Sequence, residues 1–380
     1  MKLAFFTSIG FPWGGSEILW AATAKEALQQ KHEVLISVFD WPHQHASIEA
    51  LKTKGAKFIY RRRFYPDVCT RVKKKLFNRF LPSGKKYTYH DYLKTFKPDH
   101  ILFNLAGGDE IATDTKDLMV FVQQTKIPFS VFYHSLSEQN YLSETIAENF
   151  IFVLQKAHYN FFTSQMQINL LQQHLGCSID NARIINHPLR NIKVPAATRV
   201  DKVVYNLCII GSLVTRWKGQ DMVIRILAKD HWRSLNWHLN IYGDGADKEA
   251  LLNLISEKKL TDKVTLHGHT EDVNNIFAEN DMILIPSRQD SGPIVLFEAM
   301  LAAKPVVGTY MGAMPDYITN YTTGVLAKDT TENEFENALE AAWNYRYQWE
   351  EWGKAGREKL LSSYDFEPHK TLLAKMLKKY

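Results

Sequence analysis

Short apolar runs alternate along the chain with segments in which apolar residues recur at helical spacing. In the first half, the apolar runs predict strands at Leu3–Ser8, Glu33–Phe39, Lys57–Tyr60, His100–Asn104, Phe129–Tyr133 and Asn160–Thr163, with a helix at Glu17–Gln30. The pattern then restarts, predicting helices at Gln220–Leu227 and Asp247–Lys258 and strands at Asn206–Gly211, His238–Gly243, Val264–Gly268, Met282–Pro286 and Pro305–Gly308. This alternation predicts an α/β fold whose parallel sheets are covered by helices on both faces.

The region Asn186–Lys202 separates the two series of elements. It contains two prolines and shows no clear periodicity, as expected of a connecting segment. A chain of 380 residues is also too long for one ordinary compact domain. We therefore expect a first domain over 1–190, a linker over 191–202, a second domain over 203–363 and a C-terminal helical segment over 364–380.

The composition, with 45% hydrophobic and 23% charged residues, is that of an ordinary soluble globular protein. The three cysteines are scattered and show neither metal-ligand nor disulfide spacing, which fits a reducing cytoplasm. No apolar run reaches the ~18–20 residues that a membrane span needs. The sequence thus predicts a cytoplasmic protein without a cysteine-ligated metal site, and no cofactor is expected.

The net charge of +5 is concentrated in one place. Between Arg61 and Lys86, ten basic residues stand against the single acid Asp67. The helical part, Val72–Leu81, mixes apolar with basic residues and is suited to an anionic membrane surface, where each Lys or Arg adds ~1 kcal/mol. That contact would place the protein on the inner face of the plasma membrane. A solvated basic face, or a site for an acidic acceptor, explains the same pattern. Nucleic-acid binding is not expected, because no recognised module accompanies the patch.

The strongest chemical signal is the segment PSRQDSGPIVLFEAMLAAKPVVG, residues 286–308. A strand is expected to end at its first proline, and a helix is expected to begin near its second, where a missing N–H costs nothing. The small residues between them let a ligand approach the backbone, and the free N–H groups of the first helical turn favour an anion such as a diphosphate. The residues expected to seat that anion are Ser291, Gly292, Pro293, Ile294 and Val295.

Two carboxylates flank this seat, Asp290 in the loop and Glu298 inside the helix. One is placed to meet the ligand at the helix tip, and the other reaches it one turn in. Here the sequence resembles the retaining glycosyltransferases of family 4, whose signature is a Glu-x7-Glu motif in a "PS…E-G-F-G…E-A-M-A…G-x-P-V-V" frame. The parts that match are Pro286-Ser287, Gly292, Glu298-Ala299-Met300 and Pro305-Val306-Val307.

The resemblance implies the fold called GT-B, in which two Rossmann-like domains face each other across a cleft and a C-terminal helix crosses back to the N-terminal domain. It implies that Glu298 binds the ribose hydroxyls of a nucleotide-sugar donor. Asp290 would lie where the first glutamate of the motif contacts the transferred sugar and its developing positive charge.

The segment Ile209–Asp221 resembles a second family element, "G-R-L…K-G-x-D", at the end of the first strand of the second domain. By this resemblance, Lys218 holds the donor diphosphate. The arginine of the family is Ser212 here, and Arg216, four residues on, is expected to supply the missing guanidinium. Cations at this place stabilise a diphosphate leaving group as its charge develops. A solvated basic loop is the alternative.

The loop FPWGGSE, residues 11–17, follows the first predicted strand and resembles the Gly-Gly-Ala/Ser-Glu loop that faces the donor in the family. Gly14 and Gly15 allow close backbone approach to a phosphate or a sugar. His134 follows the predicted strand Phe129–Tyr133, at the strand end where family members often place a histidine near the donor sugar. A purely structural histidine is the alternative. The loop is not the dinucleotide fingerprint, which disfavours a nicotinamide oxidoreductase.

Taken together, the resemblance implies transfer of a sugar with retention of anomeric configuration and without a divalent metal. The expected donor is a UDP- or GDP-sugar, and the expected acceptor is a glycan or a lipid-linked glycan in bacterial cell-surface polysaccharide synthesis. Two departures, Asp290 for glutamate and Ser212 for arginine, leave alternatives open. The shorter carboxylate falls about 1.5 Å short, which the backbone must offset if activity is to be strong. The alternatives are a catalytically weak glycosyltransferase-like partner subunit and a nucleotide-sugar epimerase of the same fold.

Overall fold

A computed structural model of the chain describes residues 1–10, 12–61, 93, 95–106, 111, 118–134, 143–194 and 203–378. These residues form two compact units, each built around its own parallel sheet. The first unit comprises Met1–Phe162, Leu170–Pro188 and Glu367–Tyr380, and the second comprises Thr163–Asn169 and Leu189–Phe366. Residues 62–86 of the basic stretch and residues 195–202 of the expected linker lie outside the described residues. The membrane contact proposed for the basic stretch therefore stays a prediction.

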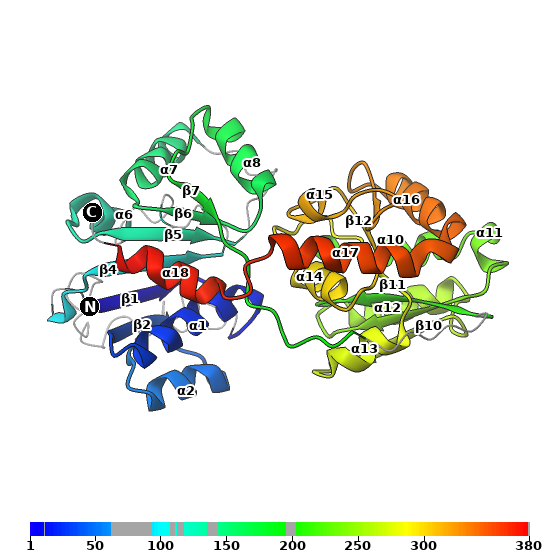
Figure 1. Ribbon diagram of the computed structural model, residues 1–380, viewed down its shortest axis with the longest axis horizontal. Helices are drawn as coiled ribbons and strands as arrows, with labels where there is room; N and C mark the ends of the chain where they lie inside the picture. The colour runs from blue at the N-terminus through cyan, green and yellow to red at the C-terminus, as the bar shows by residue number, and fades with distance from the viewer. Residues whose placement is uncertain are drawn as a thin grey trace, which may run out of the picture. The chain divides into compact units, whose positions relative to one another are not determined.

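The described part of the first unit holds seven parallel strands in the order β3-β2-β1-β4-β5-β6-β7 (Figure 1). The strands are β1 (Lys2–Thr7), β2 (Glu33–Phe39), β3 (Lys57–Arg61), β4 (His100–Leu105), β5 (Phe129–Tyr133), β6 (Asn160–Phe162) and β7 (Ala182–Ile184). The helices are α1 (Gly15–Gln29), α2 (Ala46–Thr53), α6 (Leu118–Gln124), α7 (Glu144–Lys156), α8 (Gln165–Leu175), which begins among residues of the second unit, and α18 (Pro368–Leu377). Strand order reverses between β1 and β4, and ligands of such sheets bind at the carboxyl ends of the strands at that point.

Helices α1 and α18 lie together on one face of the first sheet (Figure 1). Trp20 of α1 and Leu372 and Met376 of α18 are buried against Phe5 of β1 and its neighbours. The C-terminal helix therefore belongs to the N-terminal unit, as the sequence predicted. Burial of these apolar side chains, worth about 1.5–3 kcal/mol each, holds α18 in place.

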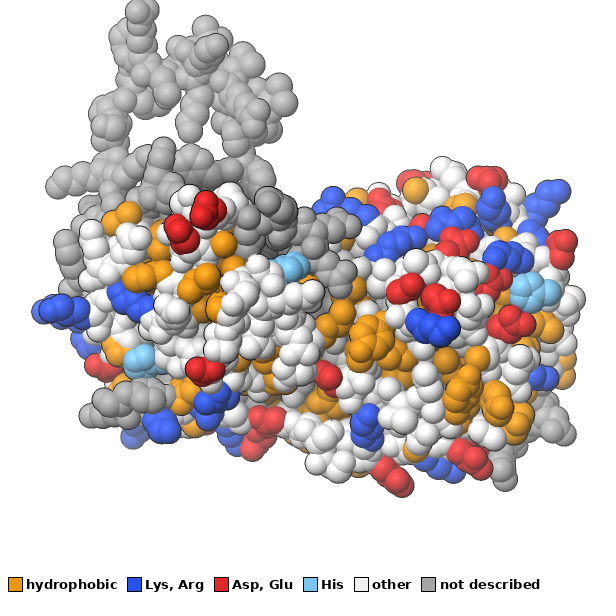
Figure 2. All heavy atoms as spheres, turned by 90° about the horizontal axis from the view of Figure 1, so that it is seen from above, with side chains coloured by type: hydrophobic (Ala, Val, Ile, Leu, Met, Phe, Trp, Pro, Cys, Tyr) orange, Lys and Arg blue, Asp and Glu red, His pale blue; other side chains and the backbone are white. Residues whose placement is uncertain are grey.

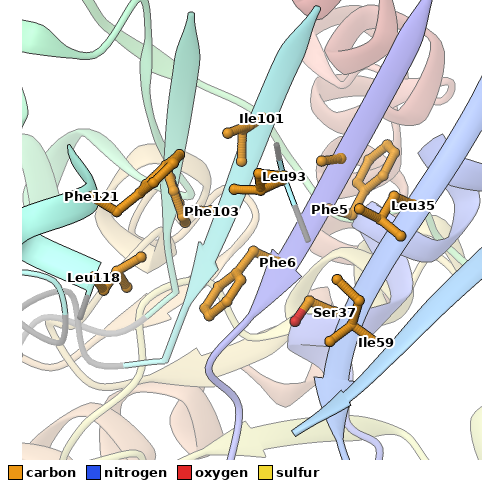
Figure 3. Close-up of a pocket in the computed structure, with 11 residues that line it drawn as sticks. Phe5, Phe6, Leu35, Ser37, Ile59, Leu93, Ile101, Phe103, Leu118 and Phe121 are labelled. Carbon is orange, nitrogen blue, oxygen red and sulfur yellow. The ribbon is translucent and has the colours of Figure 1, made fainter. Parts of the chain in front are cut away.

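Alternate residues of the same strands face the other side of the sheet, because successive side chains on a strand point to opposite faces. Phe6 of β1, Leu35 of β2 and Phe103 of β4 line a small apolar pocket there with Phe121 of α6 (Figure 3). Ser37 is the one polar side chain among the described lining residues. Such a lining favours apolar packing and offers little to hold a sugar or a phosphate.

The described part of the second unit holds six parallel strands in the order β10-β9-β8-β11-β12-β13 (Figure 1). The strands are β8 (Tyr205–Ile210), β9 (Trp237–Tyr242), β10 (Val264–Gly268), β11 (Met282–Ile285), β12 (Val306–Gly308) and β13 (Gly324–Leu326). The helices are α9 (Thr215–Lys218), α10 (Gln220–Leu227), α11 (Asp230–Arg233), α12 (Lys248–Glu257), α13 (Val273–Glu279), α14 (Ile294–Leu301), α15 (Met314–Tyr317), α16 (Glu332–Asn344), the short 3-10 helix η1 (Arg346–Gln348) and α17 (Trp349–Ser363). Here the order reverses between β8 and β11.

Helix α14 is held rigidly within the second unit. Phe297, on its buried face, lies edge-on to Tyr317 of α15 and packs against Tyr364, which follows α17, with ring centroids 4.9 Å apart in both pairs. Charged side chains of both signs are interspersed over the face of this unit seen in Figure 2. None of the described helices combines the length and apolarity needed to cross a membrane.

The two parallel α/β sheets confirm the predicted fold class, and the predicted elements agree with the structure to within about two residues at most ends. The short edge strands β7 and β13, of three residues each, were missed. Strand β7 is largely exposed at the edge of its sheet, so burial leaves no apolar run there to predict it.

Candidate functional site

The loops that follow β8 and β11 lie at the reversal point of the second sheet and carry the predicted donor-binding residues. Two glycines, Gly219 after α9 and Gly312 after β12, approach the loop that follows β11 closely. Gly219 has φ +68, and a Cβ there would lie 2.0 Å from the carbonyl oxygen of Pro286. Gly312 has φ +58, and its Cβ would lie 2.5 Å from the carbonyl oxygen of Asp290. Only glycine tolerates both the left-handed backbone and the close approach, so the geometry of the loop after β11 depends on these two positions.

Lys218 and Asp290, which the sequence placed in separate motifs, meet directly. The Nζ of Lys218 lies 2.5 Å from Oδ2 of Asp290, and the hydroxyl of Ser287 donates to the same oxygen at 3.4 Å. The lysine side chain is 29% exposed and the aspartate 12%. Lys218, predicted to hold the diphosphate, and Asp290, predicted to contact the sugar, therefore neutralise each other's charge.

A second ion pair fixes the loop after β11 to the loop after β8. Arg288 donates through Nη1 to the carbonyl oxygen of Thr215 at 2.6 Å, and through both Nη atoms to the carboxylate of Asp221 at 2.7 and 3.0 Å. Arg225 donates to the same carboxylate at 2.9 Å. A bidentate guanidinium fixes both distance and orientation, so Arg288 and Asp221 position the loop that carries Asp290.

Helix α14 begins four residues after Asp290. Pro293 is the residue that precedes the helix rather than its first helical residue, and the helix begins at Ile294. The N–H groups of Ile294 and Val295 belong to the first turn, whose N–H groups have no partner within the helix. Ser291 is buried and Gly292 is partly exposed. The five residues predicted to seat an anion are thus contiguous and end in a helix N-terminus.

Glu298 is fully buried in α14, and both of its oxygens are occupied. Arg190 donates from Nε to Oε1 and from Nη2 to Oε2, each at 2.6 Å. The arginine side chain is 49% exposed, whereas that of Glu298 is 1% exposed. These hydrogen bonds raise the pKa of Arg190 above its usual value. The carboxylate predicted to bind ribose is therefore covered by an arginine that the sequence reading did not identify.

Arg216, predicted to support Lys218, lies on the exposed side of the short helix α9. Its guanidinium stacks over the ring of Trp217 at 4.3 Å from the centroid. Helix α9 is held by Asp247, whose carboxylate accepts from the N–H and the hydroxyl of Thr215 at 2.7 and 2.8 Å. Arg216 is thus close in sequence to Lys218, but it stacks on Trp217 and does not take part in the Lys218–Asp290 ion pair.

In the first unit, the predicted Gly-Gly loop leads directly into α1. Gly14 is the residue before the helix, and Gly15 is its first residue. Glu17, in the first turn, is buried, and its carboxylate accepts from the hydroxyl of Thr7 at 3.1 Å and from Nε1 of Trp20 at 2.5 Å. Burial raises the pKa of Glu17 to about 7, against the lowering effect of these hydrogen bonds.

His134, the histidine predicted at the strand end, lies beside this cluster. Its Nε2 is 2.6 Å from Oδ1 of Asn104, and the amide nitrogen of Asn104 lies 3.3 Å from Oε2 of Glu17. The ring of His134 stacks on that of His187 at 5.3 Å. Burial and the neighbouring His187 hold the pKa of His134 well below its usual range, so this imidazole is neutral near pH 7.

Residues 205–344 match the family model described as Glycosyl transferases group 1. This match lies within the second unit, which is therefore similar to this family. Two curated relatives are N-acetyl-α-D-glucosaminyl L-malate synthase of Bacillus anthracis, 34% identical over 95 residues, and poly(ribitol-phosphate) α-N-acetylglucosaminyltransferase of Staphylococcus aureus, 22% identical over 210 residues. These alignments cover 24% and 54% of this chain but only 25% and 40% of the two relatives.

Among solved structures, HepE of Anabaena in complex with UDP has a TM-score of 0.73 at 16% identity, and its complex with UDP-glucose has a TM-score of 0.69 at 15% identity. Each comparison covers 99% of both chains. At this identity the likeness shows the fold alone. The chain has the GT-B fold of the family 4-type glycosyltransferases, which confirms the resemblance drawn from the motifs.

The matched residues 205–344 include every predicted donor-binding residue of the second unit, on α9, on α14 and in the loop before α14. Sequence reasoning missed Arg190, Arg288, Glu17 and Asn104. Glu17 follows the Gly-Gly loop, and only the resemblance of that loop to the family pattern pointed to it. The other three are polar residues with no local pattern, and their roles follow from contacts with residues distant in sequence.

Proposed function

We propose that the protein is a retaining glycosyltransferase that moves a sugar from a UDP- or GDP-sugar to a glycan or lipid-linked acceptor in bacterial cell-surface polysaccharide synthesis. The strongest support is the arrangement around α14, where two carboxylates, each paired with a cation, flank the free N–H groups of a helix N-terminus. The S. aureus relative, a poly(ribitol-phosphate) α-N-acetylglucosaminyltransferase, and the structure of HepE in complex with UDP support this proposal.

The donor diphosphate is proposed to bind at the start of α14. There it would accept hydrogen bonds from the N–H groups of Ile294 and Val295, and the lack of a side chain at Gly292 gives it access to the backbone. Lys218 and Arg216 would carry the positive charge that the leaving diphosphate needs as the bond to the sugar breaks. Because Lys218 is paired with Asp290 beforehand, donor binding exchanges one anionic partner for another.

Asp290, released from Lys218, is then placed to stabilise positive charge on the sugar. The bond from the anomeric carbon to the diphosphate oxygen breaks, a bond forms on the same face to the acceptor hydroxyl oxygen, and the hydroxyl proton passes to the leaving diphosphate. The proposal assigns no metal to these steps. Glu298 is proposed to bind the ribose hydroxyls, for which Arg190 must uncover its oxygens. Contacts of His134, Gly14 and Gly15 with the sugar stay predictions from the sequence.

Calorimetric titration with UDP, GDP and ADP tests the donor site. We expect saturable binding of one nucleotide and a loss of about tenfold or more in affinity for Lys218→Ala, since a hydrogen bond to a charged group contributes about 1.5–3 kcal/mol. Lys354→Ala is the matched control, because Lys354 makes only an exposed ion pair with Glu350 on α17. Binding that is equally weakened in both variants, or that is absent from folded wild-type protein, contradicts the proposal.

The reaction itself is tested by following a consumed UDP- or GDP-sugar by NMR, with a lipid-linked acceptor present or absent and with a chelator added. Transfer with the same anomeric configuration as the donor, unaffected by the chelator, is expected. Conversion of the donor sugar without acceptor would instead indicate an epimerase. Nucleotide binding without any turnover of donor would indicate a non-catalytic partner subunit.

A further inference from the structure

The amide of Asn104, at the carboxyl end of β4, has only one possible orientation. Its Nδ2 lies 3.3 Å from the carbonyl oxygen of Ser16 and 3.3 Å from Oε2 of Glu17. A carbonyl oxygen and a carboxylate oxygen only accept hydrogen bonds, so the atom that faces both must be the NH2 group. The amide oxygen of Asn104 is therefore the atom that faces His134.

An oxygen that only accepts, 2.6 Å from Nε2 of His134, requires a proton on that nitrogen. We propose that Glu17 and Asn104 are positioning residues that hold His134 as the neutral tautomer protonated at Nε2, so that Nδ1 is the ring nitrogen that accepts a hydrogen bond from a substrate hydroxyl. The role towards substrate rests on the proposed function. The tautomer rests on the hydrogen bonds alone.

Glu17 is the first residue of this relay, the hydrogen-bonded series Glu17–Asn104–His134. Its carboxylate accepts from three donors, namely the hydroxyl of Thr7, the indole N–H of Trp20 and the amide of Asn104. The Oγ1 of Thr7 already accepts from the N–H of Ile9 at 3.3 Å and from the amide of Asn104 at 3.2 Å. Burial raises the pKa of Glu17 to about 7 and the hydrogen bonds from Trp20 and Thr7 counter it, so at pH 7.5 the ionised carboxylate keeps the amide of Asn104 turned.

The charged and titratable groups around the relay agree with this assignment. Arg61, from β3, lies close enough to lower the pKa of Glu17, and its guanidinium donates to the carbonyl oxygen of Thr7. His187 stacks on His134 and disfavours a positive charge there. A neutral ring has one donor and one acceptor nitrogen. Since the Nε2–H group of His134 donates to Asn104, the ring nitrogen left for a substrate hydroxyl is Nδ1, which accepts a hydrogen bond.

The first test is the ring ¹⁵N spectrum of the full chain labelled with ¹⁵N-histidine, in which His134 is assigned by the signals lost in His134→Gln. The expected spectrum shows a protonated Nε2 and an unprotonated Nδ1 for His134 at pH 7.5. A protonated Nδ1, or two tautomers in exchange, would overturn the proposal. Wild-type protein suffices for this measurement, so a variant that fails to fold leaves the test intact.

The second test replaces the amide. Asn104→Asp presents a carboxylate to Nε2, so the titration midpoint of His134 should rise, whereas Asn104→Leu should give a mixture of tautomers. In assays of sugar transfer, Asn104→Leu should lower kcat about tenfold, the effect of one lost hydrogen bond, and leave the Kd for UDP within about twofold. A His134 signal that is unchanged in both variants would overturn the relay. An Nε2-protonated ring in a protein that transfers no sugar would refute the proposed function and leave the relay standing.

Discussion

Replacing Arg190 by alanine removes the cation that covers Glu298 and leaves a fully buried carboxylate without a partner. Breaking a buried ion pair in this way costs about 3–5 kcal/mol when both groups are buried, and exposed pairs contribute about 0–1 kcal/mol. Arg190 is 49% exposed and Glu298 is 1% exposed, so the pair lies between these limits. We expect Arg190→Ala to destabilise the second unit by about 2 kcal/mol, which lowers its Tm by about 4–8 °C.

The cost should depend on which partner is removed. Glu298→Met leaves Arg190 half-exposed, and water can hydrate it, so this variant should lose less stability than Arg190→Ala. The double variant should recover part of the loss, because it leaves no buried charge. The pH dependence has a definite sign. An unpaired buried carboxylate has a raised pKa, so the folded state binds a proton that the unfolded chain lacks. The loss in Arg190→Ala should therefore shrink as the pH is lowered from 8 to 5.

These values are measured by urea unfolding followed through the tryptophan fluorescence of the second unit, with Lys354→Ala as the control for an exposed pair. That control should stay within about 0.5 kcal/mol of wild type. The reasoning would be refuted by a Glu298→Met variant that is less stable than Arg190→Ala. It would also be refuted by a loss in Arg190→Ala that is the same at pH 8 and pH 5.

Three further outcomes follow from the same structure. Because burial raises the pKa of Glu17 from 4.5 to about 7, the free energy of unfolding should fall as the pH rises through that window. In urea titrations, wild type should gain about 2–3 kcal/mol over Glu17→Gln when the pH is lowered from 8 to 5, and no change with pH would contradict the raised pKa. Gly219→Ala places a Cβ 2.0 Å from a carbonyl oxygen on a left-handed backbone, and thermal unfolding should show a loss of more than about 3 kcal/mol of stability. The control Gly176→Ala, at φ +64 in open space, should lose about 1–2 kcal/mol, and equal losses would show that the close approach is unimportant. Asp290→Asn should free Lys218 and raise the affinity for UDP several-fold in calorimetry while sugar transfer falls about 10²-fold; weaker UDP binding would show that the ion pair positions Lys218 rather than competing for it.

The two sheets could be predicted from the sequence because most of their strands are buried and therefore appear as short apolar runs. The runs Glu33–Phe39 and Phe129–Tyr133 are apolar over enough residues to define a strand, and both have the predicted bounds. The loop from Pro286 to the start of α14 was also predictable, since proline, glycine and serine restrict or free the backbone at their own positions. At β7, whose residues Ala182–Ile184 are largely exposed at the sheet edge, the sequence pattern carries too little information.

The sequence by itself therefore determined the fold class and the family, and it placed Lys218, Asp290 and Glu298 among the donor-binding candidates. Only the tertiary structure showed how these side chains are paired. Lys218 and Asp290 are separated by 72 positions, and Arg190 and Glu298 by 108. Local backbone preferences act over a few residues, whereas an ion pair depends on where two distant segments are brought together by the burial of the core between them. For that reason the candidate donor-binding residues can be predicted from the sequence, whereas the ion pairs that hold them in place cannot.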